Sequence, residues 1–156
     1  MKKIIIILAI FIFDRATKLY FLNLQKISTD ADFYINSFLN FRLHMNSGIA
    51  FGLLSFEADI FYHILTGIII IINIGLIFFL FKTKHLYSYL IAVIIGGSLG
   101  NLFDRLYYYA VPDFIDLHIG NFHWWLFNVA DIFITVGIIG LIFAEILKQD
   151  EASKNV

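Results

Sequence analysis

The stretch DIFYHILTGIIIIINIGLIFFLF, residues 59–81, decides the fold class of this chain. It has no charged residue between Asp59 and Lys82, and a helix of about 20 residues is long enough to cross the hydrocarbon core of a bilayer. Ile and Phe favour strands in water, but a backbone exposed to lipid must satisfy its own hydrogen bonds. The stretch therefore predicts a membrane-spanning helix.

Three other segments predict further spans. Two are apolar for long enough to cross a bilayer core, while the first begins apolar and carries Asp14, Arg15 and Lys18 in its outer half. Lys2 and Lys3 precede it as in a secretory signal peptide, but no small-x-small cleavage site follows, so we expect the segment to be retained. The sequence predicts an all-α membrane protein, a single domain over 1–156, with four transmembrane helices at about 4–24, 59–81, 86–105 and 127–147.

The composition agrees with this class and excludes others. The 156 residues are 60% hydrophobic and 15% charged, with a mean hydropathy of +0.84, whereas soluble domains are roughly half apolar and a quarter charged. The net charge is -1 and no basic tract occurs, so no nucleic-acid partner is expected. The absence of cysteine excludes disulfides, thiolate nucleophiles and cysteine metal sites.

Basic residues predict the orientation in the membrane. By the positive-inside rule both termini and the 82–85 turn should be cytoplasmic, which leaves two longer connections, about 23–58 and 106–126, on the outer side. In the first of them apolar and polar residues alternate over 39–46, the pattern of a half-buried strand. A small extracytoplasmic β element is therefore expected. The residues assigned to the inner side are Lys2, Lys3, Lys82, Lys84, Lys148 and Lys154, and those assigned to the outer side are Lys26 and Arg42.

Polar residues gather at the outer ends of the predicted helices. An ionisable group at membrane depth costs at least a few kcal/mol, so each one is a functional candidate until a partner explains it. In the first and third helices they repeat at i, i+3 and i+4, on one helix face. The candidates are Asp14, Thr17 and Lys18, then Asn101, Asp104 and Arg105, then Asn128 and Asp131, together with Asp113 and the turn-like Asn46-Ser47-Gly48.

Charge pairing and capping are alternative explanations for these residues. Asp14 with Lys18, and Asp104 with Arg105, can be charge pairs that anchor helix ends. Asn128 can be a helix cap, with the next acidic residue in the electropositive first turn.

The remaining acidic and imidazole groups are weaker candidates. Asp116 ranks below Asp113, because residues three apart in an extended segment point to opposite faces. The histidines show no H-E-x-x-H or comparable ligand spacing and are interpreted as interfacial or structural. They are His44, His63, His85, His118 and His123.

The residue types restrict the possible chemistry. No Ser lies in a G-x-S-x-G or S-x-x-K pattern, so nucleophilic acyl transfer has no obvious carrier. Two carboxylates close together cannot both ionise cheaply, so one keeps a proton. The ionised one can activate water while the protonated one donates to a carbonyl oxygen, which is aspartic peptidase chemistry and needs no metal or cofactor.

These motifs resemble one family over nearly the whole chain, bacterial lipoprotein signal peptidase, also called signal peptidase II. Five blocks in chain order carry the resemblance, each at the outer end of a predicted span. They are Asp14 to Lys18, similar to D-x-x-T-K; Asn46 to Gly52, similar to N-x-G-x-A-F-G; Gly100 to Arg105, similar to G-N-x-x-D-R; Val111 to Asp116, similar to V-x-D-F-x-D; and Phe127 to Asp131, similar to F-N-x-A-D.

The resemblance implies an activity and a set of roles. It implies an aspartic endopeptidase at the outer face of the bacterial cytoplasmic membrane, which removes the signal peptide from diacylglyceryl-modified prolipoproteins before the lipid-bearing cysteine. Asp113 and Asp131 would be the catalytic pair. Membrane lipids and the inhibitor globomycin are further implied partners, and a short outer helix would join the β element in clasping the substrate. The implied site-shaping or substrate-positioning residues are Asp14, Lys18, Asn46, Gly48, Asn101, Asp104, Arg105 and Asn128.

Two departures from the family pattern flank the catalytic blocks. Ala110, after the Tyr run 107–109, stands where the family often has Gly, and Trp125 stands where a Pro is common. These departures leave open whether the loops have the family's shape and whether globomycin fits, but they do not alter the catalytic blocks.

Three rival functions remain open at this stage. A small transporter or proton-conducting protein also carries intramembrane charges, but would place them at the midplane and inner side. A metal-dependent lipid-phosphate transferase would cluster carboxylates for Mg²⁺. A non-catalytic assembly or chaperone protein would tolerate Asp-to-Asn changes.

Overall fold

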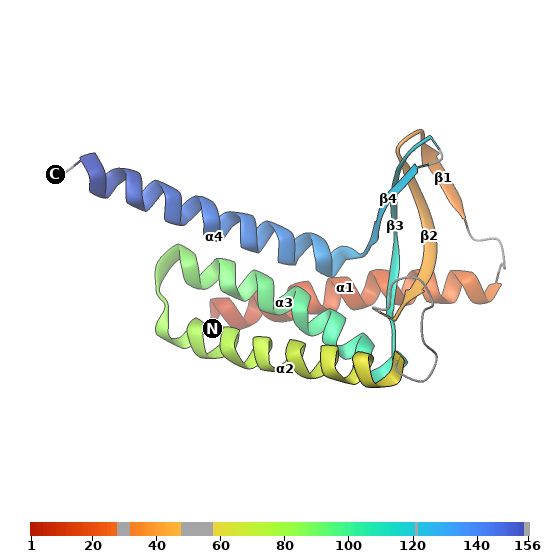
Figure 1. Cartoon of the computed structure of the whole chain (residues 1–156), viewed down its shortest axis with the longest axis horizontal. Coiled ribbons are helices and arrows are strands. Elements are labelled where there is room, and N and C mark those ends of the chain that lie inside the picture. Colours follow the sequence, from red (N-terminus) through yellow and green to blue (C-terminus); the bar gives the residue numbers. More distant parts are fainter. Residues whose placement is uncertain (28–31, 48–57, 121, 155–156) are drawn as a thin grey trace.

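The computed structural model describes residues 1–27, 32–47, 58–120 and 122–154. Four helices lie alongside one another, and an antiparallel sheet stands across one end of them (Figure 1). In chain order the elements are α1 (Lys2–Ile27), β1 (Phe33–Asn36), β2 (Leu39–Asn46), α2 (Ala58–Lys82), α3 (His85–Tyr108), β3 (Val111–Ile119), β4 (Phe122–Phe127) and α4 (Val129–Lys154).

Three helices are long and apolar enough to cross a membrane. They are Ile60–Lys82, His85–Tyr108 and Val129–Gln149 among the described residues. Many of their Ile and Phe side chains are exposed, as expected of surfaces that face lipid. The first helix has sufficient length but carries three charged residues in its middle, so its role as a fourth span stays a prediction.

The third helix is the centre of the helical bundle, because it packs against α1, α2 and α4. Small residues on α3 allow this close approach. A Cβ atom at Gly96 would lie 2.8 Å from Cβ of Ile10 in α1, and a Cβ at Gly97 would lie 2.5 Å from the carbonyl oxygen of Ala130 in α4. The ends of α1, α3 and α4 nearest the sheet are thereby held within side-chain reach of one another.

The outer connections form a larger sheet than the sequence predicted. The strand expected over 39–46 is confirmed as β2. The connection expected as a loop over 106–126 is mostly strand, because α3 continues to Tyr108 and β3 and β4 follow. The strand order is β1-β2-β3-β4, with every neighbouring pair antiparallel. Within the described residues both outer connections contain strands and no helix, and residues 48–57 lie outside those described.

The two departures from the family pattern fall at the edges of this sheet. Tyr109 ends α3 with a left-handed backbone, φ 55°, next to buried Ala110. Trp125 lies in β4, opposite Leu117 of β3. The chain therefore passes from helix to strand at a position whose backbone conformation favours glycine.

Aromatic stacking attaches the sheet to the outer half of α1. The ring of Phe21 stacks on Phe114 of β3 with centroids 4.2 Å apart, and it also contacts Phe41 of β2 at 5.4 Å. The face of β3 that contains Phe114 is thereby fixed above the helix ends. This attachment brings the loop-derived and helix-derived candidates into one region.

Candidate active site

Asn128 links the two carboxylates that the resemblance implies as catalytic. Its side-chain amide donates to Oδ1 of Asp113 at 2.6 Å, while its Oδ1 accepts the backbone N–H of Asp131 at 3.2 Å. In return, Oδ2 of Asp131 accepts the backbone N–H of Asn128 at 3.1 Å. This reciprocal pair is a capping box at the start of α4. Asn128 is therefore both the helix cap that one interpretation proposed and a direct contact of Asp113.

Two further asparagines complete the polar contacts of the pair. Asn46, at the end of β2, donates to Oδ2 of Asp113 at 2.8 Å. Asn101, in α3, donates to Oδ1 of Asp131 at 2.8 Å. Each carboxylate thus receives amide hydrogen bonds on both oxygens, and the donors come from a strand, a helix and a helix cap. We call Asp113 and Asp131 the carboxylate pair.

Asp113 is the more buried member of the pair. Only 3% of it is exposed, and this burial raises the pKa of its carboxyl group above the usual value. The amide donors Asn46 and Asn128 oppose that shift, while the negative charge of Asp131 adds to it. Burial has the largest effect, so the protonated form of Asp113 is favoured.

Beside the pair lie four charged residues that we call the charge cluster: Asp14, Lys18 and Asp104 are fully buried, and Arg15 is partly exposed. The Lys18 ammonium contacts Oδ2 of Asp14 at 2.8 Å and Oδ2 of Asp104 at 2.7 Å. Arg15 forms an ion pair with the other oxygen of Asp104. Two acidic and two basic groups balance one another, as burial in a low-dielectric region requires.

The charge cluster contacts the carboxylate pair in two ways. Lys18 donates to Oδ1 of Asn101 at 2.7 Å, and the amide of Asn101 in turn donates to Asp131. Asp14 accepts the backbone N–H of Ala130, in the first turn of α4, at 2.9 Å. A carboxylate at a helix N-terminus satisfies a free backbone donor and interacts favourably with the helix dipole. The first and last helices are therefore joined through one side chain.

Two candidates lie outside both groups. Among the described residues, the Arg105 guanidinium donates to the backbone oxygen of Asn101 at 3.5 Å. Asp104 pairs with Arg15 and Lys18 rather than with Arg105, because consecutive helical residues point in different directions. Gly48 lies outside the described residues.

An open apolar cavity borders the carboxylate pair. It measures about 750 Å³ and includes Asp131 in its wall. The rest of the wall is mostly apolar, with Leu117, Ile119, Phe127, Ile132 and Val136 among its side chains. The cavity has the size of a small-molecule or peptide subsite. It gives an apolar chain access to a carboxylate.

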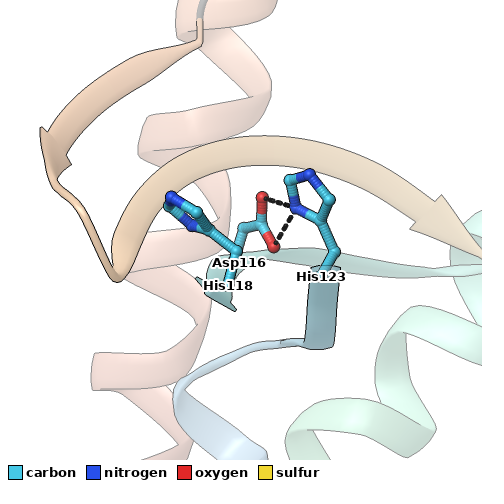
Figure 2. Close-up of side chains that lie close together, drawn as sticks. All are labelled: Asp116, His118 and His123. Carbon is cyan, nitrogen blue, oxygen red and sulfur yellow. Dashed lines mark hydrogen bonds and ion pairs between the residues drawn. The ribbon is translucent and has the colours of Figure 1, made fainter. Parts of the chain in front are cut away.

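A second polar group lies elsewhere on the sheet. Figure 2 shows Asp116, His118 and His123, in which Nδ1 of His123 approaches the two Asp116 oxygens at 3.0 and 2.8 Å. Asp116 thus has a partner of its own and does not contact Asp131 in any described interaction. The three residues have the donor types of a metal site.

Sequence reasoning missed three of these residues. Arg15 was left unassigned although it is an ionisable group at membrane depth, which was a sufficient signal. His118 and His123 flank the dipeptide Gly120-Asn121, a strong hairpin signal that predicts their direct pairing across the two strands. The structure has that pairing, and Gly120 has a left-handed backbone with φ 60°.

Comparison with known proteins agrees with this arrangement. The family model described as Signal peptidase (SPase) II matches residues 6–147. Lipoprotein signal peptidase of Pelagibacter ubique is 51% identical over 143 residues, which is 92% of this chain and 86% of that protein. The lipoprotein signal peptidase of Anaplasma phagocytophilum is 38% identical over 151 residues, or 95% and 94% of the two chains.

Solved structures give the same result for the fold. A bacterial membrane enzyme structure determined by the in meso method at 2.3 Å has a TM-score of 0.73, 34% sequence identity, and coverage of 98% of this chain and 91% of that one. Fold and site thus define an integral membrane enzyme. The chain belongs to the signal peptidase II family, a family of proteases.

Proposed function

We propose that this protein is an aspartic endopeptidase that removes the signal peptide from diacylglyceryl-modified prolipoproteins, cutting before the lipid-bearing cysteine. The observation that carries the proposal is the carboxylate pair, which Asn128 joins at the N-terminus of α4. Family membership supports the substrate class. The apolar cavity beside Asp131 supports an apolar substrate chain.

In the proposed mechanism the two aspartates have different protonation states. Asp131, in the first turn of a helix and on the cavity wall, is the ionised base that activates water. Asp113, buried and with a raised pKa, carries the proton and donates it to the scissile carbonyl oxygen. The proton arrangement then reverses as the tetrahedral intermediate collapses and the amine leaves. The residues supply all the proton transfers that amide hydrolysis needs.

Substrate binding in this proposal is mainly apolar. The signal peptide is itself a membrane helix, and the other side of the cut carries acyl chains, so most of the binding energy comes from apolar burial. Specificity follows from placing the cut at the bilayer surface. Globomycin is expected to occupy the same region and inhibit cleavage.

The proposed location is the bacterial cytoplasmic membrane, with both termini cytoplasmic and the carboxylate pair at the outer face. The start of α1, the α2–α3 turn and the far end of α4 lie at the end of the bundle away from the sheet (Figure 1). Lys2, Lys3, Lys82 and Lys84 fall at that end. Thiol labelling of single cysteines in intact cells tests the orientation: labelling at position 84 from outside would reverse it.

The test of activity uses purified protein with lipidated and unlipidated precursor in a gel-shift assay. Asp113→Asn and Asp131→Asn should each abolish cleavage, reducing the rate by at least about a thousandfold, because removing one member of a catalytic unit removes its function. Asp32→Asn is the matched control, since Asp32 is exposed and its nearest charged partner, Arg42, lies 4.0 Å away. It should cleave normally.

Two further measurements complete this test. Both inactive variants should remain folded and should still bind lipidated precursor. Globomycin should block the unaltered enzyme, and EDTA should leave its rate unchanged. Retained cleavage by either Asn variant, or activity lost to EDTA and restored by Mg²⁺ or Zn²⁺, would exclude the two-aspartate mechanism.

A further inference from the structure

Three side chains with metal-ligand atoms converge on the sheet, and none of their described contacts is with the carboxylate pair. Asp116 and His118 lie on β3, and His123 lies opposite His118 on β4. Their candidate ligand atoms all lie within 4.8 Å of one another. Figure 2 shows the Asp116 carboxylate between the two imidazole rings. The group is built on paired strands, so its backbone positions are fixed by the sheet.

The hydrogen bonds of this group leave two buried polar atoms without partners among the described residues. The Asp116–His123 contact explains only two of the three side chains. His118 is just 8% exposed, and its Nδ1 has no hydrogen-bond partner. The Oδ1 of Asn40, whose residue is directly opposite Asp116 on β2, is also buried without one. A buried polar atom without a hydrogen-bond partner is unfavourable, so these atoms point to a missing ligand.

The donor set selects a class of cation. Two imidazoles and one carboxylate are a usual donor set for Zn²⁺ and related transition metals, whereas Mg²⁺ and Ca²⁺ prefer oxygen ligands alone. Ligand atoms around one tetrahedral Zn²⁺ are about 3.3 Å apart, given Zn–N distances of about 2.0–2.1 Å. The Asp116–His123 contact, at 2.8 Å, is about half an ångström shorter than this spacing, and the three ligand atoms all lie within 4.8 Å of one another. The half-exposed His123 ring leaves room for the remaining adjustment and for entry from solvent.

We propose that Asp116, His118 and His123 form a binding site for a divalent transition-metal cation of the Zn²⁺ type, separate from the carboxylate pair. The Asn40 oxygen or a water molecule is available as the fourth ligand. A bound cation would tie the central strand β3 to β4 and to β2 above the bundle. His118 also lines the apolar cavity, so the site adjoins one wall of that cavity. The proposal does not depend on the peptidase mechanism.

The test measures binding of Zn²⁺ alone. The full chain, purified without a polyhistidine tag and stripped of metal, is titrated with Zn²⁺ by calorimetry in detergent, in the presence of Mg²⁺ and Ca²⁺. One equivalent should bind. His118→Gln and His123→Gln should each raise the dissociation constant for Zn²⁺ by at least about tenfold. Losing a residue that only hydrogen-bonds to a metal ligand already weakens metal binding by about that factor. His63→Gln is the matched control, because His63 is an exposed histidine on α2, and it should bind as the unaltered chain does.

A second readout uses the unaltered protein, so the result does not depend on whether the variants fold. Substitution with Co²⁺ should give the strong visible absorption of tetrahedral coordination. Weak octahedral absorption, no saturable Zn²⁺ binding, or binding that survives in the His118→Gln/His123→Gln double variant would overturn the proposal. Peptidase activity in EDTA is measured in parallel, and its outcome leaves this conclusion unchanged.

Discussion

The charge cluster and the carboxylate pair contain the same acidic residue type but hold it in different ways. In the cluster, Asp14 and Asp104 are fully buried and contact the cations Lys18 and Arg15 directly. In the pair, the direct donors are the neutral amides of asparagines and a backbone N–H. Contact with a cation favours the charged form of a carboxylate strongly, whereas neutral amide donors favour it less, so a carboxylate held by amides takes up a proton more readily. The cluster is thus suited to holding helices and the pair to proton transfer.

Removing Lys18, the cation that contacts both carboxylates of the charge cluster, should have the largest effect on stability. Lys18→Met leaves two buried carboxylates with one cation, and losing one partner of a buried ion pair costs about 3–5 kcal/mol. Thermal unfolding in detergent should show a large loss of stability. The charge-balanced double variant Asp14→Asn/Lys18→Met should recover part of it. A double variant no more stable than the single one would contradict the charge-balance argument.

A smaller effect is expected at the other acidic member of the cluster. Asp104→Asn keeps the shape of the side chain but weakens the contacts with Lys18 and Arg15, a loss of about 1.5–3 kcal/mol for charged hydrogen bonds. Folded enzyme should retain measurable turnover, unlike Asp113→Asn. Rates are compared on equal amounts of folded protein. Complete inactivity of folded Asp104→Asn would assign this residue to the chemistry.

Close packing of Gly100 against the charge cluster predicts a loss of stability that is similar to that of Asp104→Asn or smaller. A Cβ at Gly100 would collide with Oδ2 of Asp14, so Gly100→Ala should displace that carboxylate and destabilise the protein by about 1–3 kcal/mol. Gly67→Ala is the matched control, because nothing lies within 4 Å of a Cβ at that position on α2. It should be neutral or slightly stabilising. Equal melting temperatures for the two variants would show that the close contact is not required.

The smallest expected effect tests how the asparagine amides change the pKa of Asp113 in the carboxylate pair. Asn46 stabilises the charged form of Asp113, so Asn46→Ala should raise the pKa of Asp113 further. Asp113, the proposed acid, then stays protonated to higher pH, so the alkaline limb of the pH–rate profile should shift to higher pH. That limb belongs to the coupled pair rather than to one residue. A downward shift would contradict the assignment of Asp113 as the protonated member.

Sequence patterns predicted the helices well because the bilayer imposes a simple rule on them. Lipid demands long apolar runs, and such runs are visible at 59–81 without any structure. The strand at 39–46 was also predictable, since most of its apolar side chains lie on one face and are partly buried, while Arg42 and His44 on the other face are exposed. The strand β3 was not, because VPDFI is buried on both faces and its residues therefore do not alternate.

The contacts within the site were less accessible to sequence reasoning. Spacing showed that Asp14 and Lys18 share a helix face, and the structure has them in contact. It could not show that Arg15 rather than Arg105 pairs with Asp104, because that choice depends on how α1 and α3 pack. The approach of His118 and His123 followed from a hairpin signal that was present but not used.

The hydrogen bond from Ala130 to Asp14 has a consequence for biosynthesis. The ribosome makes α1 before α4, so the Asp14 carboxylate has no helix end to cap until α4 has been made. Asp131 arrives on that same segment. A chain that ends before α4 therefore holds neither the complete polar anchor nor the second carboxylate, and the site of this membrane protease assembles only after α4 has been synthesised.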